Sequence, residues 1–390
     1  MAIVLISLVG GRPLPNILLT LHFKPDYLYF IVSQDSIGTN RDYEKTLAAL
    51  PKPIHTSEPS VVKPYIIQDT ITQCKKIVSQ HKNDQIIINT TLGPKTMAFG
   101  VYDVAKECKH QGVQIEVCYL AREGLVYIFD NDIKSVKIGL KDYFSSYGWD
   151  VHWKTNHPND RFEDFTQYMA KNPPTSQALL ATIRQPSQGK GKRTCSTPQQ
   201  IDKDQLALLQ KIEKLGFVSN VSRDQERTRW TINSQADGEV LIGGDWLEFY
   251  VYQKAVELTN QKGEKLFDEC GWGVEDINGK GEIDFTGIFN GQIVIVSCKT
   301  EDTIKRVWFE ELHSKMEQLG KGMCSGLLVS TVSKSTRDNH DVEKYQKWAS
   351  ERQIILVLAE DISNLPLILK KIVLADGKAE PKEIPIYPRI

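Results

Sequence analysis

The sequence predicts an α/β protein made of two α/β domains with a small helical region between them. Three observations indicate this division. Short apolar runs alternate with amphipathic stretches over residues 1–150, the composition changes over 151–235, and an Asn-Gly turn joins two alternating runs within 236–390. A chain of 390 residues is long enough for two or three domains with cores of their own.

Composition narrows the cellular setting and the class of partner. The formal net charge is -1 and the isoelectric point is about 6.7, so contacts with nucleic acid must come from local patches rather than from a global basic field. The seven cysteines are widely spaced and form no CxxC pair, which favours a reducing cytoplasm over a zinc site or a disulfide framework. No apolar run approaches transmembrane length, so we expect a cytoplasmic protein with no membrane partner.

The first domain, residues 1–150, is predicted to hold a largely parallel sheet. Strands are expected at 3–9, 27–32, 54–56, 85–89, 114–120 and 125–129, and helices at 13–22, 41–50, 66–82 and 95–110. Ligands of such sheets bind beyond the carboxyl ends of the strands. The candidate ligand-binding residues follow three strands: Gly10, Gly11, Arg12, Pro13 and Asn16 after the first, Gln34, Asp35 and Ser36 after the second, and Thr90, Thr91, Gly93, Lys95 and Thr96 after the fourth.

The loop after the fourth strand, TTLGPKT at 90–96, has the composition of a phosphate site. It enters a helix, and backbone amides at a helix start, threonine hydroxyls and a lysine can cradle a phosphate. The alternative is capping chemistry alone, with Thr91 as the N-cap, Gly93 for its backbone freedom and Pro94 at the first helical position. Capping accounts for the glycine but not for Lys95. No G-x-G-x-x-G motif follows the first strand, so a dinucleotide cofactor has little support.

Residues 151–235 are predicted to form a linker that contains one small folded element. Asn-Pro-Pro at 172–174 and QPSQGKGKR at 185–193 indicate loops, and the basic end of the second stretch is either a nucleic-acid patch or a solvated linker. A helix at 202–217 followed by strand-like runs to Asn233 is similar to a small winged-helix element. Such an element either reads DNA or packs as a spacer between domains.

The third region, residues 236–390, contains a hairpin whose register can be predicted. In EIDFTGIFNGQIVIVSCK at 282–299, Asn290-Gly291 favours a two-residue type I′ turn, so that Phe289 pairs with Gln292. The register gathers four polar side chains on one face: Asp284 opposite Ser297, and Glu282 opposite Lys299. They form either a cross-strand ion pair on a solvated face or part of a metal site that positions water to attack a phosphodiester.

A second carboxylate is predicted to reach the same centre from a helix. GGDWLEFYVYQKAVEL at 243–258 is apolar nearly all round, which places Glu248 in a mostly buried setting. A buried carboxylate is costly unless it is paired or binds a metal. Helices at 303–321 and 338–351, strands at 326–330 and 354–358 and a final helix after Asp361 complete the domain. This order of elements is that of restriction-endonuclease-like folds.

Together these motifs resemble the cyclic-oligoadenylate-activated nucleases of type III CRISPR systems, which join an N-terminal CRISPR-associated Rossmann fold (CARF) domain to a PD-(D/E)xK nuclease domain. The resemblance covers most of the chain. It rests on the first-strand loop and TTLGPKT, where related proteins tend to carry Thr-Gly-Gly-Thr-Lys, and on GGDWLEFYVY and GEIDF followed by VSCKT. By position, Glu248, Asp284 and Lys299 match the helix carboxylate, the metal-binding Asp and the Lys of the motif.

The resemblance implies an antiviral effector that is allosterically activated by cyclic tetra-adenylate, bound by a homodimer across its two-fold axis. It also implies that Mn²⁺ or Mg²⁺ is held by Asp284, the Cys298 backbone carbonyl and Glu248, and that Lys299 orients or helps to deprotonate the attacking water. The expected substrates are single-stranded RNA or DNA, or duplex DNA that is nicked. The ring size of the activator, and whether the CARF domain degrades it, stay open.

One departure from the family pattern concerns the metal site. The pattern has a Glu two residues before the lysine, where this chain has Ser297. A neutral hydroxyl is a weaker ligand for Mg²⁺ or Mn²⁺ than a carboxylate. Three explanations compete: a natural variant that uses Glu282 or Glu248 instead, a domain that has lost cleavage, or a sequence altered to be inactive. The alternative function is a non-cleaving sensor that binds DNA or protein, with residues 202–233 as its contact.

Overall fold

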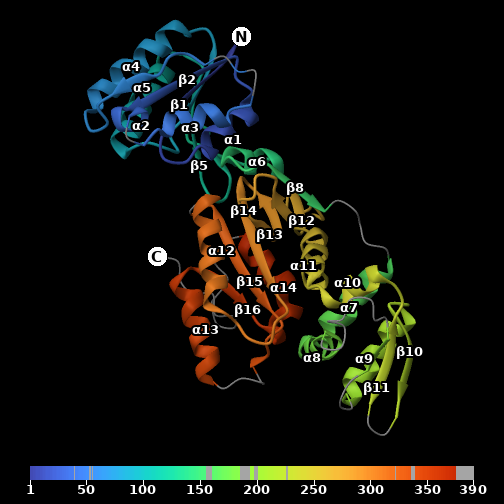
Figure 1. Cartoon of the computed structure of the whole chain (residues 1–390). Helices are drawn as coiled ribbons and strands as arrows, with labels where there is room; N and C mark the ends of the chain where they lie inside the picture. Colours follow the sequence, from blue (N-terminus) through green and yellow to red (C-terminus); the bar gives the residue numbers. More distant parts are fainter. Residues whose placement is uncertain are drawn as a thin grey trace.

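The computed structural model describes residues 1–374 except 39, 52–53, 55, 155–159, 185–193, 197–200, 225–226, 321 and 335–338. Two α/β domains lie end to end, and a third, smaller element lies at the far end of the second domain (Figure 1). The mixed α/β fold class is confirmed. The basic stretch at 190–193 lies outside the described residues. Among the described residues, none of the helices combines the length and the apolar character needed to cross a bilayer.

The first domain is built on a seven-stranded sheet with the order β3-β2-β1-β4-β5-β6-β7. The strands are β1 (Ile3–Leu8), β2 (Tyr27–Ser33), β3 (Ser60–Val62), β4 (Gln85–Asn89), β5 (Ile115–Leu120), β6 (Leu125–Tyr127) and β7 (Asp132–Lys134). The first five are parallel, as predicted, and the last two are antiparallel. β1 lies between β2 and β4, so the strand order reverses there, and a ligand crevice opens at such a switch point.

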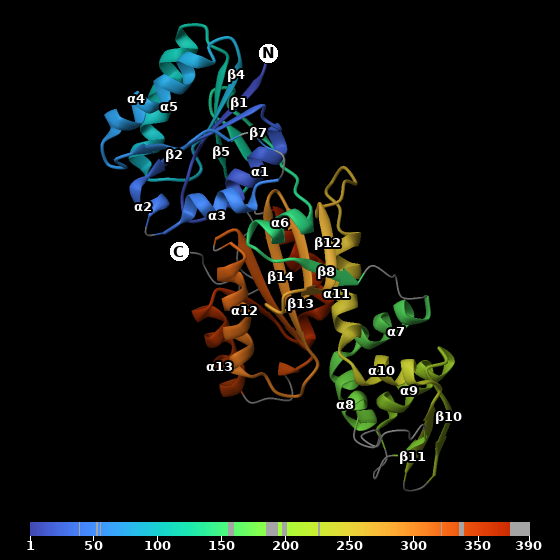
Figure 2. The same cartoon turned by 45° about the horizontal axis from the view of Figure 1, so that its top comes forward.

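Helices cover both faces of this sheet, at α1 (Leu14–Phe23), α2 (Gln34–Ile37), α3 (Asp42–Ala49), α4 (Ile67–Gln80) and α5 (Lys95–His110). α4 and α5 pack on one face, while α1 and α3 lie on the face turned toward the second domain (Figures 1 and 2). The four predicted helices are present within a few residues. The strand predicted at 54–56 falls partly outside the described residues, and Ser60–Val62 is the strand that pairs with β2.

The second domain is built on a six-stranded mixed sheet with the order β16-β15-β14-β13-β12-β8. Its strands are β8 (Val151–Lys154), β12 (Glu269–Asp276), β13 (Glu282–Phe289), β14 (Gln292–Lys299), β15 (Cys324–Ser330) and β16 (Ile354–Val357). The sheet's edge strand β8 comes from the region that the sequence assigned to the linker, and it pairs antiparallel with β12. A strand this short contains too few residues for the alternation of apolar and polar side chains to reveal it.

Two pairs of helices enclose this sheet. α11 (Asp245–Glu257) and α14 (Leu365–Leu374), which follows a 3₁₀ turn at Ala359–Asn364, cover one face. α12 (Arg306–Gln318) and α13 (Asn339–Glu351) cover the other. The smaller element contains α7 (Asp160–Lys171), α8 (Pro173–Arg184), β9 (Thr194–Ser196), α9 (Lys203–Lys214), β10 (Val218–Arg223), β11 (Thr228–Ile232) and α10 (Gln235–Ile242). Its predicted helix and hairpin are confirmed, with the sheet order β10-β11-β9.

The two large domains share a continuous apolar core. One cluster of buried residues runs from α1 and α3 of the first domain, through α6 (Leu140–Ser146), to α12 and the second sheet. Polar contacts cross the same junction. Tyr143 Oη donates to the Leu319 carbonyl at 2.8 Å, and Gln292 Nε2 donates to the Arg122 carbonyl at 2.6 Å. The relative position of the domains is therefore held by packing as well as by the chain connection.

Candidate active site and sensor loops

The hairpin of β13 and β14 has the predicted turn and register. Asn290 and Gly291 both have positive φ, 46° and 68°, as a type I′ turn requires. Phe289 pairs with Gln292, and the ladder continues to the pair of Phe285 and Val296. Extending this ladder brings the polar ends of the two strands together, which is the arrangement that the sequence predicted.

Asp284 is the centre of the polar group at the end of the hairpin. Its Oδ2 accepts a hydrogen bond from the Cys298 backbone N–H at 2.5 Å and one from Ser297 Oγ at 3.4 Å. Lys299 Nζ lies 3.9 Å from the same oxygen. The ion pair of Lys299 is therefore with Asp284 and not with Glu282, so the simple cross-strand pair is not what forms.

Glu248 joins this group from α11. Burial, with further repulsion from Asp284, raises the pKa of Glu248 to about 8. Among the described residues its Oε2 atom is buried and has no hydrogen-bond partner. Native structures rarely leave a buried polar atom unpaired, and such an atom often marks an ion or water that completes the site. The side chain is thus placed as a cation ligand would be, and a bound cation would favour its deprotonated form.

The donor set fits a divalent cation only in part. Oxygen donors of Glu248 and Asp284 repel each other, which a cation between them would relieve. Yet no group of three or more His, Cys, Asp or Glu side chains among the described residues has the geometry to hold a metal ion. Ser297, the neutral neighbour of this pair, lies with its Oγ 3.4 Å from Asp284 Oδ2. The two carboxylates therefore fit a cation only with fewer than three charged side-chain ligands.

The polar group opens into a cavity of about 170 Å³ between the hairpin and α12. Glu282, Asp284, Ser297 and Lys299 line its sheet side. The helix side is lined by residues spaced as on one helical face: Trp308, Glu311, Leu312 and Lys315. Sequence reasoning predicted this helix but assigned none of its residues to the site. The amphipathic spacing of its residues was the only sequence signal that could have pointed to them. Spacing alone does not say which face of the sheet the helix covers.

In the sensor domain, the loops after β1 and β4 lie side by side. A Cβ on Gly10 would come within 3.1 Å of the Gly93 backbone nitrogen, so a side chain there would require one of the two loops to move slightly. Gly93 has a φ of +78°, which a non-glycine residue rarely adopts. Lys95, the first residue of α5, is exposed beside them. The predicted phosphate loop and the first-strand loop therefore form one surface.

Hydrogen bonds within the protein use some of the predicted donors. Thr90 Oγ1 donates to the Cys118 carbonyl at 3.0 Å, and Thr96 Oγ1 donates to the Pro64 carbonyl at 2.5 Å. Thr91 Oγ1 instead accepts from the Leu120 N–H at 2.8 Å, so its hydroxyl proton is still available. Thr91 is not the N-cap of α5, because that position is occupied by Pro94.

Two of the residues predicted to bind a ligand are buried inside the protein. Asn16 is fully buried: its Nδ2 donates to the Leu8 carbonyl at 3.2 Å and its Oδ1 accepts from Asn89 Nδ2 at 2.9 Å. Ser36 is 5% exposed and its Oγ lies 2.9 Å from Ser33 Oγ, at the start of α2. Both therefore support the loops from inside rather than face a ligand directly. Gln34 and Asp35 are exposed in the same turn.

Gly11, Arg12 and Pro13 face a second cavity, of about 520 Å³, at the junction of the two domains. Its opposite wall is formed by the end of α12 and the loop after α6, including Gln318, Gly320 and Tyr147. The first-strand loop therefore lies between the loop after β4 and α12, the helix that also lines the cavity of about 170 Å³. Arg12, predicted as a ligand-binding residue, lines this cavity between the domains.

Comparison with known proteins assigns both domains. The Card1 CARF domain matches residues 4–143, and the Card1-like endonuclease domain matches residues 236–375. No curated protein sequence matches the chain.

Three solved structures have a similar fold. Can2 from Sulfobacillus thermosulfidooxidans in complex with cyclic tetra-adenylate is 14% identical, with a TM-score of 0.67 over 95% of this chain and 97% of that one. Protein VC1899 from Vibrio cholerae is 14% identical, with a TM-score of 0.70 over 96% of this chain and 98% of that one. A type III CRISPR defence DNA nuclease activated by cyclic oligoadenylate is 16% identical, with a TM-score of 0.50 over 84% of this chain and 45% of that one.

Because the sequence identities are low, these structural matches show only that the fold is similar. The two domain matches rest on the sequence itself, and they follow each other along the chain in the predicted order. With a Card1 CARF domain followed by a Card1-like endonuclease domain, the chain belongs to the Card1-like family of CARF nucleases.

Proposed function

We propose that this protein is a metal-dependent nuclease activated by cyclic tetra-adenylate, acting in type III CRISPR defence in the cytoplasm. The observation that carries the proposal is that Asp284 pairs with Lys299 and interacts electrostatically with Glu248, whose buried Oε2 has no hydrogen-bond partner among the described residues. A Card1-like endonuclease domain and the cyclic tetra-adenylate held by Can2 support the choice of reaction and activator.

In this proposal Glu248, Asp284 and the Cys298 carbonyl hold Mn²⁺ or Mg²⁺. The bound cation would stabilise charge on the phosphate and lower the pKa of a water. Lys299 Nζ lies 3.9 Å from Asp284 Oδ2, where it can donate a hydrogen bond that orients the attacking water. Attack on phosphorus breaks one P–O bond of RNA or DNA, and the departing oxygen takes a proton.

The activator is proposed to bind on the joined loops after β1 and β4, in a homodimer. Thr91 and Lys95 supply a hydroxyl proton and an ammonium there. Exposed apolar side chains adjoin this surface on α5 and the loop before α4: Tyr65, Ile66, Phe99 and Tyr102. Apolar patches of this kind mark interaction sites. A second copy packed there would place two sensor loops around one symmetric ligand.

Nuclease assays with Mn²⁺, with and without cyclic tetra-adenylate, test the proposal on single-stranded RNA, single-stranded DNA and supercoiled plasmid. Cleavage by the wild-type chain only with activator supports it. Cleavage by Ser297→Glu alone shows that the site is intact but lacks its third carboxylate. If neither protein cleaves any substrate under activator, the nuclease proposal is wrong.

A non-cleaving sensor is the second candidate, and the missing third carboxylate favours it. Its contact with DNA would be the smaller element, where α9 and the β10-β11 hairpin expose Lys203, Lys211, Lys214, Arg227 and Arg229. Retention of duplex DNA in EDTA that depends on cyclic tetra-adenylate and is lost in Lys211→Gln/Lys214→Gln would support this candidate. Metal-dependent cleavage by the wild-type chain would exclude it.

A further inference from the structure

We propose that Lys315 is a second substrate-binding cation of the catalytic cavity, which contacts a phosphate oxygen of the nucleic acid from the helix wall. This inference rests on the proposed nuclease function and deepens it. Lys315 and Lys299 line the same 170 Å³ cavity, Lys315 from α12 and Lys299 from β14. A phosphate that enters between them would be held by one ammonium on each wall.

The side chain of Lys315 is placed on this wall by the geometry of α12. Trp308, Glu311 and Lys315 lie three and four residues apart, so they share the helix face that lines the cavity. The Lys299 ammonium lies over the Trp308 ring, 5.8 Å from its centroid. This cation–π contact joins the sheet wall of the cavity to its helix wall. Lys315 is therefore one turn after Glu311 and about two turns after Trp308 on the same wall.

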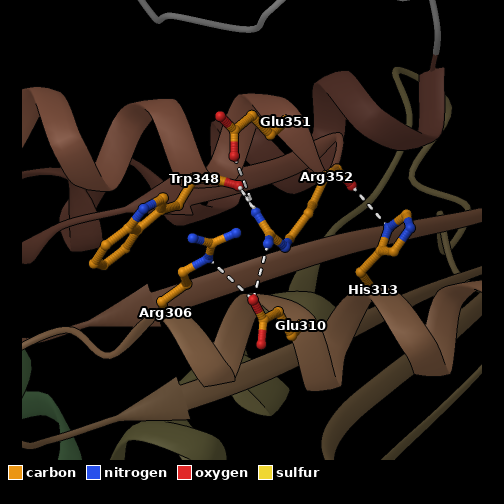
Figure 3. Close-up of polar contacts among 6 residues, drawn as sticks. All are labelled: Arg306, Glu310, His313, Trp348, Glu351 and Arg352. Carbon is orange, nitrogen blue, oxygen red and sulfur yellow. Dashed lines mark hydrogen bonds and ion pairs between the residues drawn. The ribbon is translucent and has the colours of Figure 1, made fainter.

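The opposite face of α12 is fixed to α13 by a separate polar network (Figure 3). Glu310 Oε1 accepts from Arg306 Nε and from Arg352 Nη2, each at 3.0 Å. His313 Nδ1 donates to the Arg352 carbonyl at 3.2 Å. These contacts hold this face of α12 against α13, so the face that carries Lys315 is turned toward the cavity.

Lys315 has carboxylates nearby but pairs with none of them. In the described part of the chain its ammonium donates to the Glu282 carbonyl and forms no ion pair. Burial lowers the pKa of Lys315 and Lys299 adds to the effect, while Asp284, Glu311 and Glu282 oppose it. A partly buried cation without a paired anion is costly, and a phosphate oxygen would supply that anion. A lysine binds phosphate as a point charge, so no fixed fork geometry is needed.

A purely structural role is the competing explanation, since the hydrogen bond to Glu282 also holds the start of β13. The two roles differ in their dependence on salt. A phosphate contact releases a counterion, so its loss lowers the slope of log affinity against log salt by about 0.7 for a single strand. Loss of a structural tether lowers stability and leaves that slope unchanged.

The test is binding of a labelled single-stranded oligonucleotide to the full chain in EDTA with cyclic tetra-adenylate, over a series of KCl concentrations. We expect Lys315→Gln to bind about tenfold more weakly near 0.1 M salt, as for loss of one charged hydrogen bond, and to lower the slope by about 0.7. Lys315→Arg should restore both values. Lys347→Gln, which removes an exposed cation from α13, should change neither.

Glu311→Gln provides a second test that leaves Lys315 intact. Glu311 is exposed on the same cavity wall, so removing its charge should strengthen binding of the oligonucleotide with no loss of slope. If the wild-type chain binds but Lys315→Gln keeps the wild-type slope, or Glu311→Gln leaves affinity unchanged, the inference is wrong and the nuclease proposal stands. If the wild-type chain binds neither RNA nor DNA, both are wrong.

Discussion

Leu18 of the sensor domain packs directly on Gly291, at the tip of the hairpin that carries Asp284 and Lys299. A Cβ on Gly291 would lie only 2.5 Å from Leu18 Cδ2, so a side chain there would require the buried Leu18 side chain to move. Nearby, Asn290 Nδ2 donates to the Glu123 carbonyl at 3.4 Å. The strands that bear the catalytic candidates are thus in contact with the domain that is proposed to bind the activator.

Gly291→Ala should separate the domains locally and destabilise the protein by about 1–3 kcal/mol, because it adds a clash to an unfavourable backbone conformation. Urea unfolding measures this. Gly279→Ala is the matched control, since Gly279 also has a positive φ of 77° but no atom within 4 Å of its Cβ position. Equal losses in the two variants would contradict the role assigned to Leu18. Adding Leu18→Ala to Gly291→Ala should recover part of the loss.

Ser297→Glu should tighten binding of Mn²⁺ by at least 10–100-fold, because it supplies the carboxylate that the pair Glu248 and Asp284 lacks. Isothermal titration calorimetry on metal-free protein measures the affinity directly. Ser297→Gln has a similar size without the charge and should give little gain. Equal affinities in the two variants would show that position 297 does not face the ion.

Metal-free protein should lose stability as the pH rises from about 4.5 to about 8. In this window the native state keeps the proton on Glu248, whose pKa is raised from 4.5 to about 8, while the unfolded chain has lost it. The native state then binds more protons than the unfolded state, so unfolding becomes easier as protons are removed. Urea unfolding of the wild type and of Glu248→Gln in EDTA should differ most at the alkaline end.

With Mn²⁺ present the trend should reverse. The metal binds the deprotonated carboxylate, so its affinity should increase with pH up to about 8. Glu257→Gln, on the exposed end of α11, is the control and should keep the wild-type pH dependence in both conditions. A Glu248→Gln protein with wild-type pH dependence would mean that Glu248 is not the group responsible.

Phe99→Asp should convert a dimer into monomers and weaken binding of cyclic tetra-adenylate. Phe99 is 63% exposed on α5, one turn after Lys95, and a charge there opposes burial of the apolar patch against a second copy. Sedimentation velocity and calorimetry measure the two effects. Ile277→Asp, at a 62% exposed position of the second domain, should alter neither. A monomeric wild-type chain, or a dimeric Phe99→Asp, would exclude this interface.

Much of the catalytic hairpin could be predicted because local rules determine it. The Asn-Gly turn requires two positive φ angles, and the alternation of side chains then assigns Asp284 and Ser297 to one face. The burial of Glu248 followed from a helix that is apolar on nearly every side. The meeting of Gly10 with Gly93 followed from parallel strands that end at one edge of a sheet.

Other features could not be predicted, because they depend on how distant surfaces pack. The sequence indicates that α12 is amphipathic, but nothing local shows that its apolar face covers the catalytic side of the sheet and brings Lys315 into the cavity. Likewise Asn16 was predicted to bind a ligand, yet its amide is buried by contacts with Leu8 and Asn89.

The sequence by itself determined the two α/β domains, the hairpin register and the identity of the candidate carboxylates, since these follow from side-chain period and turn chemistry within short segments. Only the tertiary structure decided that Lys315 faces Lys299, that Leu18 meets Gly291 and that Arg12 lies at the domain junction. These relations join residues far apart in the chain, and they arise from burial of one apolar core shared by both domains.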